Sequence, residues 1–256
     1  MIRSLDSLIR SNLWVYDQLR KRAVFLCRYF LLEEGFSFLR HVDAQNGTVA
    51  IDIGSNDGTS IEMIRRLQPD TSIHAFDPIV EPRMAYKYQR VAFHNVALSE
   101  FEGELILYVP TIHHLQLTQY SSSDPRKVVS QLLGDFSIEQ SEIVLSEVTS
   151  RSTRLDSMNL KPYFIKIDVE GHEESVLLGS LQTISRHRPV LLIELQSLEA
   201  YKSIEKLMKE MDYFNLRWPQ RNQAKRLDEE GTYSRKMNNY LWLPIGTSPN
   251  WNLKTR

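Results

Sequence analysis

The chain has 256 residues, of which 42% are hydrophobic and 25% are charged, a composition typical of a globular protein with a substantial buried core. Its 31 basic residues nearly balance 32 acidic ones, so the charge gives no indication of a nucleic-acid partner. The single cysteine, Cys27, excludes an intrachain disulfide framework and fits a reducing, cytoplasmic location.

Residues 1–40 are predicted to be helical, because their apolar residues approximate a one-sided stripe. Residues 1–30 carry six basic residues against two acidic ones, and a basic amphipathic helix can lie on an anionic membrane. Such a helix also commonly packs on its own domain or on another subunit. The run Ala23–Leu32 contains Arg28 and is too short to span a membrane. We therefore expect a helical extension over residues 1–45, with peripheral membrane contact and oligomeric state left open.

From about residue 48, short apolar runs alternate with helical patterns. Strands are expected at TVAIDIG, SIHAFDP and VAFHNVAL, helices at IEMIRRLQ and MAYKYQR between them, and an additional strand at GELILYVP. This order predicts a parallel sheet with crossover helices. We assign residues 46–256 to one such domain.

Residues 111–146 interrupt this order with a long segment that contains a Ser-rich turn at Ser121–Pro125, followed by a helical stretch. Loops of this length in compact domains are usually functional lids or disordered segments. Downstream, YFIKIDVEG and PVLLIELQ are expected to be strands, HEESVLLGSLQTI one helix with Gly179 inside it, and YKSIEKLMKEM an amphipathic helix. YFNLRW and NYLWLP are the expected last strands, joined by a polar loop from Pro219 to Asn239.

A glycine-rich loop, DIGSNDG, follows the first expected strand and opens a helix. Gly54 and Gly58 allow a tight turn and close approach to a ligand. The dinucleotide fingerprint G-x-G-x-x-G has glycine where this chain has Asp52. A carboxylate there repels a pyrophosphate but attracts the ammonium and sulfonium charges of S-adenosylmethionine. A glycine-rich turn without a ligand is the alternative interpretation.

Other acidic residues end successive strands of the expected sheet. Asp77 lies 25 positions beyond Asp52, where this fold class holds a ribose, although it can also cap a helix. Asp168 and Glu194 end two later strands, so all four carboxylates are expected along one rim, where their repulsion favours a positive group between them. A divalent metal on Asp168, Glu170 and Glu194 is an alternative, but no separate ligand motif accompanies them, and we assign no metal.

The motifs DIGSNDG, FDP, NVALSE, RLDS, IKIDVEGHEESVLLG and PVLLIE resemble the FkbM family of methyltransferases over about Val49 to Glu194. The resemblance implies a Rossmann-like α/β fold with a seven-stranded, mostly parallel sheet and helices on both faces. It also implies S-adenosylmethionine as cofactor and O-methylation of a sugar, glycolipid, polysaccharide or natural-product hydroxyl. Transferred to matching positions, the cofactor-binding residues are Asp52, Gly54, Asn56, Gly58, Asp77, Asn95, Ala97, Ser99 and Asp168.

Methylation of an alcohol is helped by a general base, because an alcohol is a poor nucleophile. His172 is our first candidate for this base, and Asp168 and Glu170 are alternatives, although Glu170 can equally anchor its loop. His113 and His114 lie in the interrupting segment and either contact the acceptor or are exposed loop residues. A nicotinamide-dependent oxidoreductase and a non-catalytic scaffold of the same fold remain alternative functions.

Overall fold

The computed structural model describes residues 33, 35–42, 49–79, 89–217, 225–226 and 239–246. Several sequence predictions lie outside these residues: the N-terminal helices up to residue 32, Cys27, and all but the last two residues of the MAYKYQR helix. The boundary at residues 45–46 is also outside them and stays a prediction. Every helix within the described residues is too short or too polar to cross a lipid bilayer.

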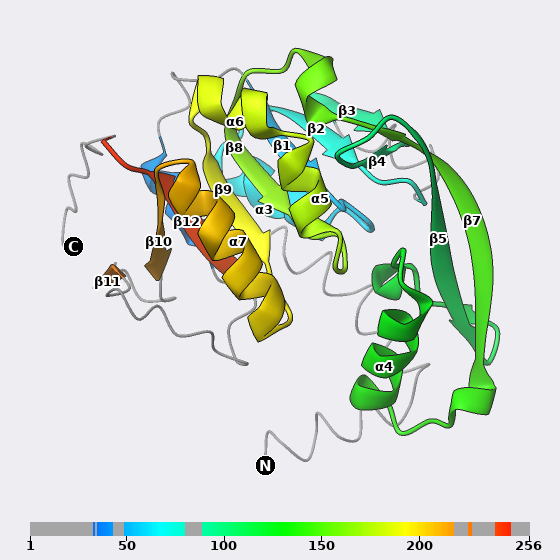
Figure 1. Ribbon diagram of the computed structural model, residues 1–256. Coiled ribbons are helices and arrows are strands. Elements are labelled where there is room, and N and C mark those ends of the chain that lie inside the picture. The colour runs from blue at the N-terminus through cyan, green and yellow to red at the C-terminus, as the bar shows by residue number, and fades with distance from the viewer. Residues whose placement is uncertain are drawn as a thin grey trace.

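Eight strands form the main sheet of the described chain (Figure 1). Their spatial order is β11 (Lys225–Arg226), β10 (Tyr213–Arg217), β12 (Asn239–Pro244), β9 (Val190–Glu194), β8 (Pro162–Ile167), β1 (Val49–Ile53), β2 (Ser72–Phe76) and β3 (Val91–His94). β1 is parallel to its neighbours β2 and β8, whereas β12 is antiparallel to both β9 and β10. Seven of these strands give the mostly parallel sheet that the sequence predicts, and the two-residue β11 adds an edge strand inside the predicted polar loop.

The two central strands, β1 and β8, are buried along their whole length. Strands covered on both faces are mostly continuous apolar runs, which explains the sequences VAIDI and PYFIKI. The exceptions are Asp52 and Lys166, which are register partners on the two strands. Two buried charged residues therefore lie side by side at the centre of the sheet.

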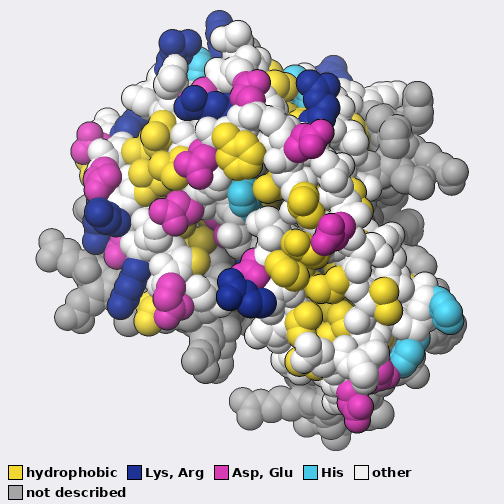
Figure 2. Space-filling view, turned by 45° about the vertical axis from the view of Figure 1, so that its right-hand side comes forward, with side chains coloured by type: hydrophobic (Ala, Val, Ile, Leu, Met, Phe, Trp, Pro, Cys, Tyr) yellow, Lys and Arg dark blue, Asp and Glu magenta, His cyan; other side chains and the backbone are white. Residues whose placement is uncertain are grey.

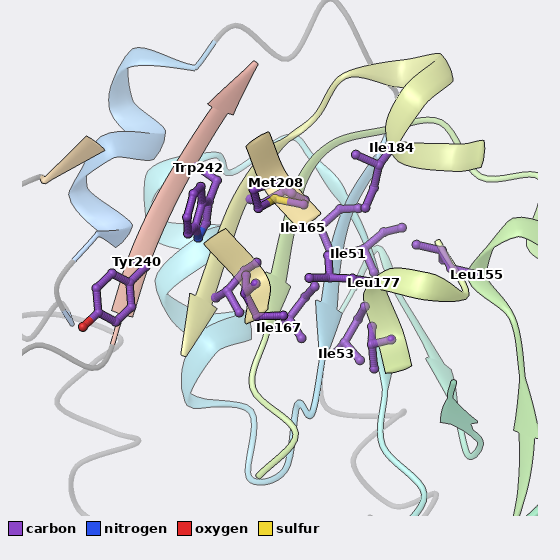
Figure 3. Close-up of a cluster of buried hydrophobic side chains, with 14 of the residues drawn as sticks. Ile51, Ile53, Leu155, Ile165, Ile167, Leu177, Ile184, Met208, Tyr240 and Trp242 are labelled. Carbon is purple, nitrogen blue, oxygen red and sulfur yellow. The ribbon is translucent and has the colours of Figure 1, made fainter. Parts of the chain in front are cut away.

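Helices cover both faces of the main sheet, as predicted (Figure 1). One face packs against α5 (Glu173–Leu178), α6 (Leu181–His187) and α7 (Leu198–Glu210), and Figure 3 shows the cluster in which Ile51 and Ile165 of the sheet meet Leu177 and Met208. The other face packs against α3 (Thr59–Leu67) and the 3₁₀ helix η1 (Phe36–His41).

The predicted helix HEESVLLGSLQTI is interrupted at Gly179, which ends α5 before α6 begins. A β-carbon at residue 179 would lie 1.9 Å from the backbone oxygen of Ser99. The prediction of one continuous helix was therefore wrong. Gly179 lies between two helices, and its missing side chain lets the backbone at Ser99 approach closely.

A second sheet flanks the segment expected to be a long loop around residues 111–146 (Figure 1). Its four strands, in spatial order, are β4 (Ala97–Leu98), β7 (Ile143–Thr153), β5 (Gly103–Ile112) and β6 (Leu115–Gln116). β5 pairs antiparallel with β7 from Gly103↔Ser152 to Ile112↔Ile143. The predicted strand VAFHNVAL is divided, because β4 joins this second sheet and leaves β3 in the main one.

The predicted helical stretch in this segment is α4 (Pro125–Asp135), which begins where the side chain of Asp124 accepts a hydrogen bond from the backbone N–H of Arg126. Val128 and Leu132 of α4 pack with Phe136 in a small core beside β5. Three short 3₁₀ helices complete the described elements: η4 (Thr118–Tyr120), η5 (Gln140–Glu142) and η6 (Leu155–Met158). The interrupting segment is thus a folded subdomain with its own core. We call residues 103–153 the insertion.

Candidate active site

A cavity of about 560 Å³ lies at the carboxyl ends of β1, β2 and β8, where ligands bind in open α/β sheets. This volume is in the usual range of small-molecule sites, about 300–1,000 Å³. The described cavity-lining residues include five with carboxylates and one lysine. These are Glu33, Asp57, Asp77, Asp168, Glu170 and Lys166.

The glycine loop forms one wall of this cavity. Gly54 has a φ of 81°, and a β-carbon there would lie 1.7 Å from the backbone oxygen of Asp168. Gly58 has a φ of 85° and precedes the first residue of α3. Both glycines are therefore required by backbone geometry, and Gly54 specifically by the neighbouring strand.

Asp52 is fully buried, and its Oδ2 accepts a hydrogen bond of 2.5 Å from the hydroxyl of Ser60. Its Oδ1 has no hydrogen-bond partner among the described residues. Burial raises the pKa of Asp52 to about 7. Asp52 lies behind the loop rather than in the cavity lining, so its predicted contact with the cofactor stays a prediction.

Lys166 is the residue that the sequence analysis left without a role. Its side chain is 2% exposed, and its Nζ lies 3.3 Å from Oδ2 of Asp168 and 3.8 Å from Oε2 of Glu194. Burial alone would lower the pKa of Lys166, but these carboxylates outweigh that effect and hold the pKa above its usual value. The sequence predicts a positive group between the acidic residues at this edge of the sheet. Lys166, which belongs to the sheet itself, is one such group. The only sequence signal was a lysine inside an otherwise apolar strand.

Asp77 lines the cavity and holds the glycine loop in place. Its Oδ2 accepts a hydrogen bond of 2.9 Å from the backbone N–H of Asn56, and its Oδ1 accepts one of 2.9 Å from that of Ile79. Asn56 itself has a φ of 37° and accepts a hydrogen bond from the hydroxyl of Thr118, a residue of the insertion. The loop is thus tied to both β2 and the insertion.

Three of the predicted cofactor-binding residues, Asn95, Ala97 and Ser99, occupy different places. Ala97 lines the cavity together with Val96 and Leu98. Asn95 is exposed and donates to the backbone oxygens of Asp77 and Pro78, outside the lining. Ser99 is buried behind the cavity.

His172 lines the cavity from the residue that precedes α5. Its Nε2 lies 3.0 Å from the hydroxyl oxygen of Ser99, whose other neighbour is the hydroxyl of Ser175, also at 3.0 Å. Burial lowers the pKa of His172, with a smaller opposing effect from Glu100. A neutral, oriented imidazole therefore faces the cavity.

Glu170 lines the cavity in a strained conformation, with a φ of 51°. Its Oε2 accepts hydrogen bonds from the side-chain amides of Gln131 at 2.9 Å and Gln196 at 2.6 Å, and the two glutamines also contact each other. Burial, with the nearby charge of Asp168, raises the pKa of Glu170 to about 7. Glu170 is anchored by amide side chains from α4 and from the segment after β9.

His113 and His114 form the two-residue turn between β5 and β6, with φ of 46° and 68°. The Nε2 of His113 lies 2.8 Å from Oε1 of Glu142. Neither histidine lines the cavity. The insertion instead contributes Leu105, Leu107, Thr118, Gln119 and Ser121 to the lining.

The described residues contain no group of three or more histidine, cysteine, aspartate or glutamate side chains arranged to hold a metal ion. Lys166 already lies between Asp168 and Glu194, two of the residues considered as metal ligands.

On the molecular face shown in Figure 2, basic and acidic side chains are interspersed.

The sequence profile described as the methyltransferase FkbM domain matches residues 52–214, more than half of the chain. Among solved structures, a methyltransferase FkbM from Methylobacillus flagellatus KT is 17% identical, with a TM-score of 0.46, and the match covers 83% of this chain and 48% of that one. This chain therefore spans about half the length of that protein.

A precorrin-6y C5,15-methyltransferase from Geobacter metallireducens GS-15 is 13% identical, with a TM-score of 0.38, over 80% of this chain and 84% of that one. A comparison with curated protein sequences gives no match.

Proposed function

This chain belongs to the methyltransferase FkbM domain family, and we propose that it transfers the methyl group of S-adenosylmethionine to a hydroxyl group of an acceptor molecule. S-adenosylmethionine is the methyl donor of this family. The O-methylation, the residues and the acceptor class are parts of the proposal.

The charge of the cavity is the observation that carries the proposal. Five residues with carboxylates and a single lysine line it among the described residues. The sulfonium and ammonium groups of S-adenosylmethionine suit such a lining, whereas the pyrophosphate of a nicotinamide cofactor would be repelled by it. The cavity therefore favours a methyl donor over the alternative oxidoreductase.

Different parts of the cavity suit different parts of the cofactor. The loop from Gly54 to Gly58 would surround the methionine end, and Asp77 at the end of β2 would hold the ribose. The apolar side chains of Phe76, Ala97 and Leu98 would pack against the adenine.

When bound, the cofactor supplies a methyl group on a positively charged sulfur. His172 would accept the proton of the acceptor hydroxyl as the oxygen bonds to the methyl carbon and the carbon–sulfur bond breaks. Its lowered pKa keeps the imidazole neutral at pH 7, and Ser99 fixes its orientation. Asp168 and Glu170, which also line the cavity, are the alternative candidates for the base. Glu170 is the weaker base candidate, because both glutamine amides already bind its Oε2.

The insertion would form the acceptor side of the cavity. Leu105 and Leu107 present apolar surface, while Thr118, Gln119 and Ser121 present hydroxyl and amide groups. A wall with both kinds of surface suits an acceptor that carries hydroxyls on a partly apolar frame. Sugars, glycolipids and hydroxylated natural products have this chemistry.

Two measurements test the proposal. Calorimetric titration should show binding of S-adenosylmethionine, and tight binding of a nicotinamide cofactor in its place would contradict it. Radiolabelled S-adenosylmethionine should then transfer its methyl group to a member of a panel of saccharides, lipid-linked saccharides and hydroxylated natural products, and Asp168→Ala should reduce the transfer. Binding without transfer to any acceptor would support the non-catalytic scaffold.

A further inference from the structure

Lys166 lies in the wall of a cavity whose other charged side chains are acidic, and it is the only lysine or arginine in the described part of that wall. Its ammonium group is completely buried, yet no contact to Nζ among the described residues meets hydrogen-bond geometry. The carboxylates of Asp168 and Glu194 lie at ion-pair distances of 3.3 and 3.8 Å. An ammonium group has three donors, so Lys166 retains capacity for an anionic ligand.

A second polar group of the same wall also lacks a partner. The hydroxyl of Ser55, next to Gly54 in the glycine loop, is buried and has no hydrogen-bond partner among the described residues. Buried polar groups in folded proteins are nearly always hydrogen-bonded, so one left over in a cavity wall indicates a ligand. Ser55 follows β1 and Lys166 lies on the adjacent β8, so both lie in the part of the cavity wall beside the glycine loop, where the methionine end of the cofactor is proposed to bind.

We propose that Lys166, assisted by the hydroxyl of Ser55, binds the carboxylate of the methionine end of S-adenosylmethionine and makes the site selective for ligands that carry this carboxylate. This inference rests on the proposed function, since it assigns one group of that cofactor. The acidic lining explains attraction for the cofactor's cations, but it repels the cofactor's anion. A buried cation in the same wall resolves this conflict.

The test compares two ligands that differ at this one group. Decarboxylated S-adenosylmethionine keeps the sulfonium and the amine but lacks the carboxylate. Its net charge is more positive, so a merely acidic cavity would bind it more tightly than S-adenosylmethionine. Lys166 reverses this order: calorimetric titration of the wild-type protein should show S-adenosylmethionine binding about ten- to hundredfold more tightly, the usual effect of a hydrogen bond to a charged group.

The variant Lys166→Met should bind both ligands with similar affinity or prefer the decarboxylated one. Lys202→Met is the matched control, because Lys202 is exposed on α7 and outside the cavity, and it should keep the wild-type preference. Ser55→Ala should reduce the preference about threefold to tenfold.

Removing Lys166 leaves Asp168 and Glu194 without their counter-charge, which threatens the fold. The variant Lys166→Met/Glu194→Gln lowers that negative charge and should show the same loss of preference. If Lys166 is only an internal counter-ion without ligand contact, the ratio of the affinities for S-adenosylmethionine and its decarboxylated form will be the same in the wild type and in all variants. This result would overturn the inference. A wild-type protein that binds neither ligand would instead contradict the proposed function, whereas equal binding of both contradicts only the role of Lys166.

Discussion

Gly54 lies so close to Asp168 that a β-carbon at residue 54 would be 1.7 Å from the backbone oxygen of Asp168. The glycine loop and the segment that follows β8 therefore lie in close backbone contact. The same contact sets the position of the loop and that of Asp168 in the cavity wall.

Gly54→Ala should destabilise the protein and prevent cofactor binding, because it adds a clash with backbone and a strained positive φ. We expect a loss of about 3 kcal/mol or more in the free energy of unfolding, measured by urea denaturation. Gly134→Ala is the matched control, because a β-carbon there meets no atom within 4 Å and alanine favours the helix. Equal stability of both variants would contradict the assigned contact.

His172→Ala should lower the rate of methyl transfer by about 10²- to 10⁴-fold, the usual contribution of a general base, and leave the affinity for S-adenosylmethionine nearly unchanged. Rate and affinity are measured by radiolabel transfer and calorimetry. His187→Ala, at the end of α6 and outside the cavity, should behave like the wild type. Unchanged turnover in His172→Ala would dismiss His172 as the base.

The pH dependence of kcat/KM separates His172 from Glu170. If neutral His172 accepts the proton, activity rises with pH through its pKa, which burial places below the usual value of about 6.5. If Glu170 accepts the proton, the rise is centred on about pH 7. We expect activity to be at its plateau by pH 7, and a half-maximal rate at pH 7 would transfer the role to Glu170.

Asp52→Asn should flatten the dependence of stability on pH. The pKa of Asp52 is raised to about 7 in the folded protein and is about 3.9 in the unfolded chain, so the folded state binds more protons between these values. The protonated Asp52 side chain therefore stabilises the folded protein fully below about pH 4, and this stabilisation is lost as the pH rises through about 7. Urea denaturation should show that the variant gains up to about 4 kcal/mol relative to the wild type between pH 4 and pH 8. The hydrogen bond from Ser60 is kept, since asparagine also has an acceptor oxygen.

Thr118→Val should weaken S-adenosylmethionine binding about fivefold, because it removes the hydrogen bond of 3.1 Å from Thr118 to the side-chain oxygen of Asn56 in the glycine loop. Thr149→Val is the control, since Thr149 is exposed on β7. If Thr118→Val binds the cofactor as well as the wild type, the insertion does not help to position the loop.

The sequence alone predicted the main sheet, because its signals are local. Apolar runs such as VAIDI and PYFIKI mark buried strands, the spacing of Tyr201, Ile204 and Met208 marks one face of α7, and Gly54 and Gly58 mark the turn at the end of β1. The resemblance in the same segments identified the family that the profile match shows.

The sequence predicted β5 as the strand GELILYVP, but the pairing of the second sheet and the inner structure of the cavity came only from the tertiary structure. β5 and β7 find their partners across a long stretch of chain, and β7 carries no strict alternation that marks a strand. Glu170 is held by Gln131 and Gln196, which lie 39 and 26 positions away.

Lys166 is an isolated charge in an apolar strand when the chain is read in order. Asp168 follows two residues later, but Glu194 comes beside Lys166 only once β8 and β9 pair in the sheet. Local patterning determines which segments become strands and helices, since it depends on neighbouring residues. The partner of a buried charge depends on which distant strands become adjacent, and only the folded chain decides that.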